Sequence, residues 1–154
     1  MRHAPVTSTS VPTAGSGDQP TGLAADAFRR LNADRASNGL PPLMWSAALA
    51  RSADAHTRRM DAAGTLSHQL PGEADPGSRI TAAGFRWGQW GENCADAEGT
   101  GSAPTVTMQA DFLDDAPHRA NVLTTTMTYV GIAVVADPAT GFEWLTEDFG
   151  KPLS

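Results

Sequence analysis

The side chains best suited to chemistry in this sequence are four histidines and one cysteine, spread along the chain. They are His3, His56, His68, His118 and Cys94. No two histidines have the H-E-x-x-H spacing of a helical zinc site, and no G-x-S-x-G segment marks a serine nucleophile. Ser67 precedes His68, but adjacent side chains on an extended segment point in opposite directions, which disfavours a direct dyad. Local spacing therefore predicts no complete catalytic or metal site, and only the fold could assemble one.

Length, charge and cysteine content restrict the kinds of protein that this chain could be. The 154 residues suit one domain, and the net charge of -6 results from 17 acidic and 11 basic side chains. The basic side chains are scattered, without the cluster that nucleic-acid binding requires, and no stretch approaches the roughly 18 consecutive apolar residues of a membrane span. Because Cys94 is the single cysteine, no internal disulfide can form. We expect a monomer that binds no nucleic acid and does not span a membrane.

The N-terminal segment differs in composition from the rest of the chain. Residues 1–21 are rich in Ser, Thr, Pro and Gly and hold almost no large apolar side chain, so they cannot bury enough surface to offset their ordering entropy. We predict a disordered arm over 1–21 and one folded domain over 22–154. The first residues also lack the apolar run of a signal peptide, so export would need a segment outside this chain, or the protein stays inside.

Apolar periodicity and breaker residues predict helices in the first part of the domain. The predicted helices cover residues 23–37, 47–63, 78–83, 104–113 and 118–123. Within the second of these, His56 shares one face with Leu49 and Met60, which favours a satisfied core histidine over a ligand. Cys94 is predicted to be a small buried hydrophobe.

The end of the chain has the pattern of a β-hairpin. A β-branched run over 129–135 and an alternating run over 142–149 flank a turn at 137–141. Residues 84–93 contain three glycines and two tryptophans and are predicted to form a loop or an irregular strand. Helices followed by a closing antiparallel hairpin predict an α+β fold.

Six short motifs occur in order between residues 23 and 151. They are Leu31-Asn32 with the run from Gly39 to Trp45, the apolar face from Leu49 to Met60, Leu66-Ser67-His68, Arg79-Ile80 with Gly91-Glu92-Asn93, the run from His118 to Leu123, and Val130-Gly131-Ile132 with Asp148-Phe149-Gly150. Together they resemble the short bacterial domains of the CAP superfamily, which contains cysteine-rich secretory proteins, antigen 5 and pathogenesis-related 1 proteins. The resemblance implies a three-layer α-β-α sandwich with a small antiparallel sheet and a surface cleft, in an extracellular or cell-surface protein.

The resemblance also implies a site. In many members the cleft holds two histidines and two acidic residues that can bind a divalent metal; matched by position, these are His68, Glu92 and His118, with Asp115 as the second acid. Asp115 is shorter than the usual glutamate by a methylene, and Phe112 replaces the more usual tryptophan. Imidazole and carboxylate donors suit Zn²⁺ or another divalent metal. The alternative is that His68 and Glu92 hydrogen-bond each other and hold the walls of the cleft.

Four further polar residues are predicted to support the cleft: Asn93, Arg119, Asn121 and Glu147. The resemblance implies a secreted binding module whose polar cleft holds a divalent metal or a small ligand, with an apolar groove for a lipid or a peptide. Two alternatives stay open. One is a metal-assisted hydrolase or protease with Glu92 as the general base, and the other is a purely structural surface domain. No catalytic residue is assigned, and no cofactor is obligatory.

Overall fold

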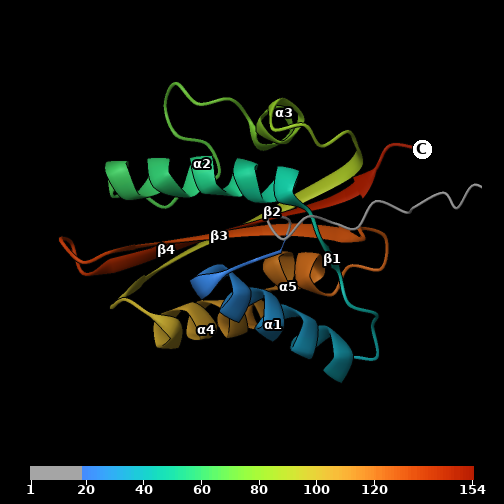
Figure 1. The fold of residues 1–154 in the computed structure, drawn as a ribbon, viewed down its shortest axis with the longest axis horizontal. Helices are drawn as coiled ribbons and strands as arrows, with labels where there is room; N and C mark the ends of the chain where they lie inside the picture. The colour runs from blue at the N-terminus through green and yellow to red at the C-terminus, as the bar shows by residue number, and fades with distance from the viewer. Residues whose placement is uncertain (1–18) are drawn as a thin grey trace, which may run out of the picture.

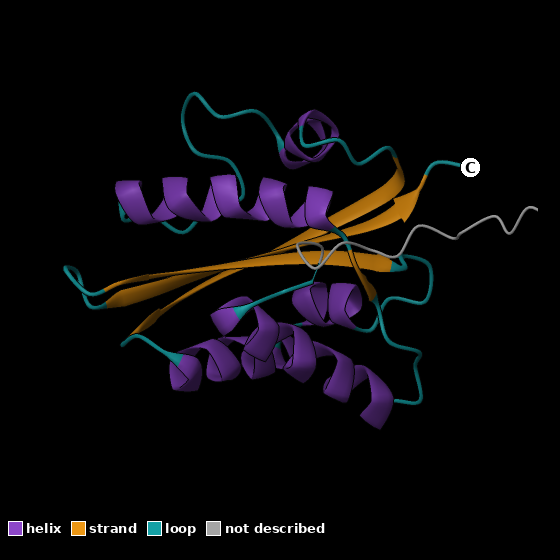
Figure 2. Ribbon diagram, in the orientation of Figure 1, coloured by secondary structure: helices purple, strands orange, loops and turns teal. Residues whose placement is uncertain are grey.

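The computed structural model describes residues 19–154, in which a sheet lies between two layers of helices (Figure 1). One layer contains α2 (Ala47–Ala63) and α3 (Pro76–Ala82). The other contains α1 (Gly22–Ser37), α4 (Ser102–Asp111) and α5 (Ala116–Val122), as the colouring by secondary structure makes clear (Figure 2). The predicted three-layer α-β-α sandwich is therefore confirmed.

Four strands form the sheet in the order β1-β3-β4-β2. They are β1 (Met44–Trp45), β2 (Trp87–Glu98), β3 (Tyr129–Asp137) and β4 (Phe142–Pro152). All pairs are antiparallel except the short parallel contact between β1 and β3. The predicted hairpin is confirmed as β3 and β4, which remain paired from Tyr129↔Gly150 to Asp137↔Phe142.

Of the two predictions for residues 84–93, a loop or an irregular strand, the structure confirms the irregular strand, whose register shifts between Trp87 and Gln89. From Trp87 onward they belong to β2, a strand of 12 residues that pairs with β4 as far as Glu98. The glycines and tryptophans of this segment have no clear strand pattern by themselves. Its order comes from pairing with residues more than 40 positions away, a tertiary effect that overrides local propensity.

The predicted helices are all present, with shifted ends. α2 begins after Ser46, whose Oγ accepts a hydrogen bond from the Leu49 backbone N–H (3.2 Å), and ends at Gly64, which has a left-handed φ of 57°. α4 begins two residues before the predicted start and gives way to a 3₁₀ turn over Phe112–Asp114. α5 begins at Ala116 rather than at residue 118.

Close contact between α2 and β3 depends on a glycine. A Cβ on Gly131 would lie 2.0 Å from the Ala50 backbone nitrogen, so no larger residue allows this approach. Apolar side chains fill both faces of the sheet, with Leu31 and Phe149 among those on the α1 side and Met60 and Trp144 on the α2 side. Cys94 is buried with Met60 and Trp144, as predicted.

Two further sequence predictions concern the N-terminal arm and the absence of a membrane-spanning segment. Most of the predicted arm, residues 1–18, lies outside the described residues, and the division of the chain at residue 22 stays a prediction. Among residues 19–154, no helix combines the length and the apolar composition needed to cross a membrane.

Candidate functional site

The loop between α2 and α3 presents His68 to Glu92 of β2. His68 Nδ1 donates to Glu92 Oε1 over 2.9 Å, and Arg79 Nη2 of α3 donates to Glu92 Oε2 over 2.8 Å. Arg79 Nη2 also donates to the backbone oxygen of His68 (2.8 Å). The Glu92 side chain is 1% exposed, whereas the His68 side chain is 56% exposed. Glu92 is thus a buried carboxylate whose two oxygens both accept hydrogen bonds, and one of these bonds holds Nδ1 of the exposed His68 imidazole.

Neighbouring groups decide how this pair is protonated. The hydrogen bond to Glu92 raises the pKa of His68, and burial opposes that rise. Burial alone would raise the pKa of Glu92, but the hydrogen bond from His68 and the charge of Arg79 hold it below its ordinary value. Burial and the adjacent Glu92 carboxylate raise the pKa of Asp148 well above its ordinary value. The raised pKa favours the protonated form of Asp148 beside an ionised Glu92.

His118 and Asp115 form a second imidazole–carboxylate pair, at the start of α5. His118 Nδ1 lies 2.7 Å from Asp115 Oδ2, and both side chains are partly exposed. The Phe112 ring lies against the imidazole, with the ring centroids 5.1 Å apart. His118 lines a cavity of about 230 Å³ together with Leu66, Cys94 and Phe112. The second histidine therefore borders an open cavity.

Side-chain amides join β2 to α5 and β4. Asn93 Nδ2 donates to the backbone oxygen of His118 (3.2 Å) and to Glu147 Oε2 (3.1 Å). Asn121 Nδ2 donates to Asn93 Oδ1 (2.9 Å). Position 91 must be glycine for this arrangement, because a Cβ on Gly91 would lie 2.6 Å from Asn121 Oδ1. Three of the four residues predicted to support the cleft thus form one hydrogen-bonded group.

The fourth, Arg119, is directed elsewhere. Its Nη1 donates to the backbone oxygen of Leu113 (3.1 Å) in an exposed region. Glu147, by contrast, is completely buried. Burial raises the pKa of Glu147 to about 8, although the hydrogen bond from Asn93 acts in the opposite direction. This hydrogen-bonded group therefore contains a buried carboxyl group whose ionisation is energetically unfavourable.

The structure brings the four predicted metal ligands together as two pairs and not as one cluster. Among residues 19–154, no three ligand atoms within 4.8 Å of one another include both His68 and His118. Cys94 connects the pairs, because its Sγ lies 3.8 Å from His68 Nδ1 and its side chain lines the same cavity as His118. The single ligand set of His68, Glu92, His118 and Asp115 stays a prediction.

Comparison with known proteins identifies the family. Residues 28–149 match the sequence model of the cysteine-rich secretory protein family, abbreviated CAP. The chain belongs to the CAP family. It is 29% identical over 120 residues to the uncharacterized protein YkwD of Bacillus subtilis (strain 168), an alignment that covers 78% of this chain and 44% of YkwD.

Solved structures share the fold of this CAP domain. An extracellular protein containing a SCP domain from Bacillus anthracis str. Ames has a TM-score of 0.71 at 24% identity, covering 92% of this chain and 45% of that one. An outer surface protein from Borrelia burgdorferi has a TM-score of 0.72 at 17% identity, covering 82% of this chain and 90% of that one. The chain thus spans less than half the length of its two Bacillus relatives.

Two more distant structures of the same fold contain metals. NaASP2 with Zn²⁺ has a TM-score of 0.54 at 11% identity, covering 89% of this chain and 87% of that one. Manganese-bound Ac-ASP-7 has a TM-score of 0.52 at 16% identity, covering 92% and 76%.

A third histidine of this CAP domain, His56 of α2, is completely buried. Its Nδ1 lies 2.7 Å from Glu73 Oε1, and its Nε2 lies 2.7 Å from the backbone oxygen of Ser67. Since both ring nitrogens are engaged, neither is available to a metal. The prediction of a satisfied core histidine is confirmed.

His56, Glu92 and Cys94 do offer ligand atoms within 4.8 Å of one another. The contacts argue against a metal among them. The nitrogens of His56 and the oxygens of Glu92 are already bonded. Burial and the nearby Glu92 carboxylate raise the pKa of the Cys94 thiol, so it stays protonated and is a poor ligand. This group is a buried polar part of the core.

Sequence analysis of this CAP domain missed three titratable residues that shape the site: Glu73, Arg79 and Asp148. Arg79 and Asp148 occur in motifs that carry the family resemblance, but a motif marks a position and not a contact. Arg79 Nε lies 3.4 Å from Glu73 Oε1 while its Nη2 bonds Glu92. One arginine thereby links both imidazole–glutamate pairs, which only the tertiary structure shows.

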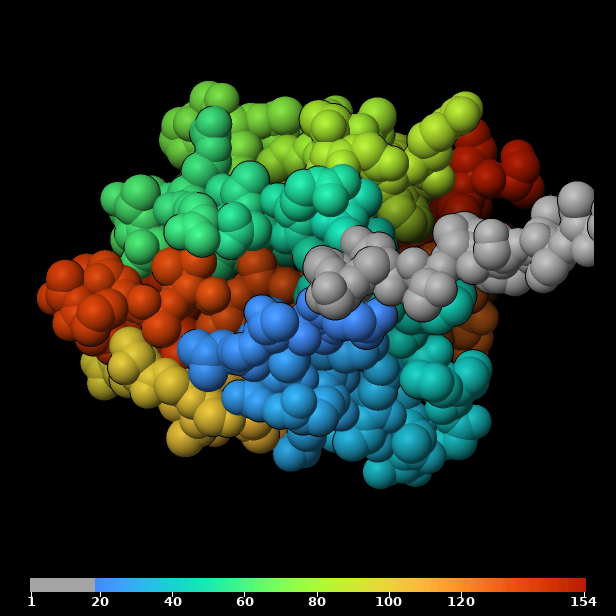
Figure 3. All heavy atoms as spheres, in the orientation of Figure 1, coloured from blue at the N-terminus to red at the C-terminus, as the bar shows by residue number. Residues whose placement is uncertain are grey.

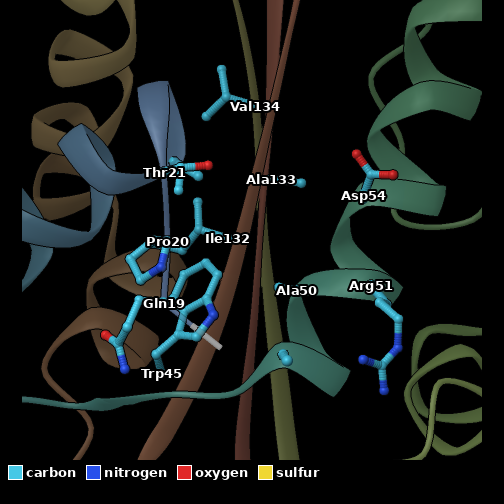
Figure 4. A pocket seen from close by; sticks show the side chains of 12 residues that line it. Gln19, Pro20, Thr21, Trp45, Ala50, Arg51, Asp54, Ile132, Ala133 and Val134 are labelled. Atoms are coloured by element: carbon cyan, nitrogen blue, oxygen red, sulfur yellow. The ribbon is translucent and has the colours of Figure 1, made fainter. Parts of the chain in front are cut away.

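A cavity of about 430 Å³ follows the edge of β3 beyond its short pairing with β1. Figure 4 shows Pro20, Thr21 and Trp45 on one side of it and Arg51 and Asp54 of α2 on the other. The predicted site residues do not line this cavity.

Proposed function

We propose that this CAP domain is an extracellular binding module whose cleft holds a divalent metal ion, with Zn²⁺ as the first candidate, through the imidazoles of His68 and His118. The observation that carries the proposal is that each imidazole meets a carboxylate at Nδ1. Among the described residues, nothing hydrogen-bonds either Nε2. A carboxylate behind an imidazole fixes its tautomer and makes the other nitrogen a better ligand.

The donor set suits the proposed metal. Neutral imidazole nitrogens are common Zn²⁺ ligands, and a zinc site with few protein ligands keeps positions for water or a small ligand. When bound, the ion would act as a Lewis acid that attracts an anionic or carbonyl oxygen. Glu92 would orient His68, because both of its oxygens are bonded to His68 and Arg79. The Zn²⁺ and manganese in the two distant relatives support a metal in this fold.

The extracellular location is supported by relatives described as an extracellular protein and an outer surface protein. The hydrolase alternative gains less support. A general base needs a carboxylate that is free to take a proton. The Glu92 carboxylate is buried, both of its oxygens accept hydrogen bonds, and its pKa lies below the ordinary value. An apolar groove for a lipid or peptide stays a prediction.

Calorimetric titration of the full chain with Zn²⁺ at pH 7.5 tests the proposal. His3 is a possible source of background binding, so His3→Ala serves as the reference protein. We expect one site, with His68→Ala and His118→Ala each abolishing it or weakening it strongly. No Zn²⁺ binding by the reference protein, or binding equally tight in both histidine variants, would contradict the proposal.

The pH dependence supplies a second readout. Zn²⁺ competes with protons for the histidines, so affinity should fall as pH decreases. Because Glu92 raises the pKa of His68, the decline should begin at a higher pH than an ordinary histidine would give. Glu92→Gln removes that charge, and we expect the decline to move to lower pH. An unchanged pH profile in this variant would show that His68 is not a ligand.

A further inference from the structure

A cavity of about 490 Å³ lies between α2 and α3, apart from the proposed metal site. These two helices form the upper part of the surface in Figure 3. Arg51, Arg59 and Arg79 line the cavity with small side chains between them. In a chain with net charge -6, three guanidinium groups around one cavity form a local positive site.

The positive charge of the cavity is only partly balanced. Glu73 is the acidic residue among its lining, and Glu73 already contacts His56 and Arg79 and accepts from the backbone N–H of Leu70. Among residues 19–154, no carboxylate lies within 4.0 Å of Arg51 or Arg59, whereas their neighbour Arg58 pairs with Asp54 at 2.9 Å. Arg51 Nη2 donates to the backbone oxygen of Ala83 (3.0 Å), which leaves the positive charge of Arg51, like that of Arg59, without a carboxylate partner. Both guanidinium groups can therefore attract an external anion.

The lining of the cavity combines apolar and polar groups. It includes the methyl groups of Ala55, Ala74, Ala82 and Ala83. Ser52 and Arg79 also line it, and the buried Ser52 Oγ and Arg79 Nη1 have no hydrogen-bond partner among the described residues. Buried donors normally have partners, so these two atoms indicate that a polar group or a water belongs beside them.

We propose that this cavity binds small carboxylates with a short aliphatic body. A guanidinium matches a carboxylate in shape and charge, and the alanine methyl groups provide contact for an aliphatic chain. The volume lies within the roughly 300–1,000 Å³ of ordinary small-molecule sites. Inorganic phosphate offers the charge without the apolar body, and hexanol offers the body without the charge. Both should therefore bind more weakly than hexanoate.

Titration of the full chain with hexanoate, followed by ¹H–¹⁵N spectra, tests the proposal. We expect saturable shifts at the amides of α2 and α3. Arg51→Gln and Arg59→Gln should each weaken binding about tenfold, the usual effect of losing one charged hydrogen bond. The matched control is Arg58→Gln, one position away and already paired with Asp54, which should bind as the wild type does. Arg79 is left unchanged because it also holds Glu92.

Several outcomes would overturn the proposal: no saturable shifts with hexanoate, an equal loss in Arg58→Gln, or equally tight binding of phosphate or hexanol. A second variant removes dependence on the arginines. Ala55→Asp places a carboxylate on the exposed wall of the cavity, where it should compete for the arginines and abolish hexanoate binding with an unchanged fold. Wild-type hexanoate affinity in this folded variant would contradict the proposed location.

Discussion

His56 and His68 share one arrangement but differ in what surrounds it. Each imidazole directs Nδ1 at a glutamate, over 2.7 Å to Glu73 and 2.9 Å to Glu92. His56 is completely buried and its second nitrogen meets a backbone oxygen, whereas the His68 side chain is more than half exposed. The same pair is therefore a structural element where both nitrogens are satisfied, and a candidate binding group where one is left over.

Arg79 makes the two regions depend on each other. Its guanidinium contacts Glu73 beside His56 and Glu92 beside His68. The buried pair thus helps to position the carboxylate that orients the exposed one. This arrangement predicts that changes near His56 lower stability, and changes near His68 alter binding.

The largest expected effect is the loss of stability in His56→Ala. The substitution leaves a cavity, removes one hydrogen bond of Glu73 and unpairs the backbone oxygen of Ser67, which should cost about 3 kcal/mol. His68→Ala should cost well under about 1 kcal/mol, because its side chain is exposed. Urea unfolding of both variants measures the difference. Equal losses would break the distinction between a structural and a binding histidine.

A second prediction compares two buried glutamates. Both oxygens of Glu92 accept hydrogen bonds from charged or polar side chains, and its pKa is lowered. Glu147 is completely buried, and that burial raises its pKa to about 8. Its folded state holds a proton that the unfolded state releases near pH 4.5, so stability should fall as pH rises from about 4.5 to about 8.

Glu147→Gln keeps the shape of the side chain and removes its titration. We expect this variant to be more stable than the wild type at pH 8, by on the order of 4 kcal/mol, and about equal to it near pH 4.5. Thermal unfolding across this pH range checks the difference, with Glu143→Gln as a second buried acid for reference. A pH-independent gap between Glu147→Gln and wild type would contradict the assigned cause.

The contrast between the two glutamate pairs also marks what sequence could predict. His68, Glu92 and His118 follow from the ordered motifs, and His56 follows from its place on an apolar helix face. Glu73 lies in a Pro/Gly-rich loop with no local pattern, and its position beside His56 depends on how that loop folds back. Sequence left β2 open between a loop and an irregular strand for the same reason, since the order of this strand depends on its pairing with β4. The periodicity of apolar residues indicates which face of a helix or strand is buried. Contacts between segments far apart in the sequence produce no such pattern.

The third prediction compares the two carboxylates of the proposed metal site. Glu92→Gln should lower Zn²⁺ affinity about tenfold, the lower end of what is lost with a residue that orients a ligand. Asp115→Asn should have a smaller effect, because Asp115 is 54% exposed and its charge is screened by water. Calorimetric titration in the His3→Ala background measures both. A larger loss in Asp115→Asn would reverse the proposed roles of the two pairs.

The smallest expected effect concerns the N-terminal segment. Two deletions of different length test whether its residues contribute to the stability of the domain. Removing residues 1–18, which lack apolar periodicity, should leave the melting temperature unchanged to within about one degree.

Removing residues 1–21 also takes away Thr21 and Pro20. The backbone oxygen of Thr21 accepts a hydrogen bond from the Ala25 N–H at the start of α1, and Pro20 lines the cavity beside Trp45. One lost backbone hydrogen bond is worth about 1 kcal/mol, which corresponds to a decrease of a few degrees in a domain of this size. Differential scanning calorimetry of both truncated chains distinguishes the two segments. A decrease of several degrees after removal of 1–18 alone would show that the predicted arm packs on the domain.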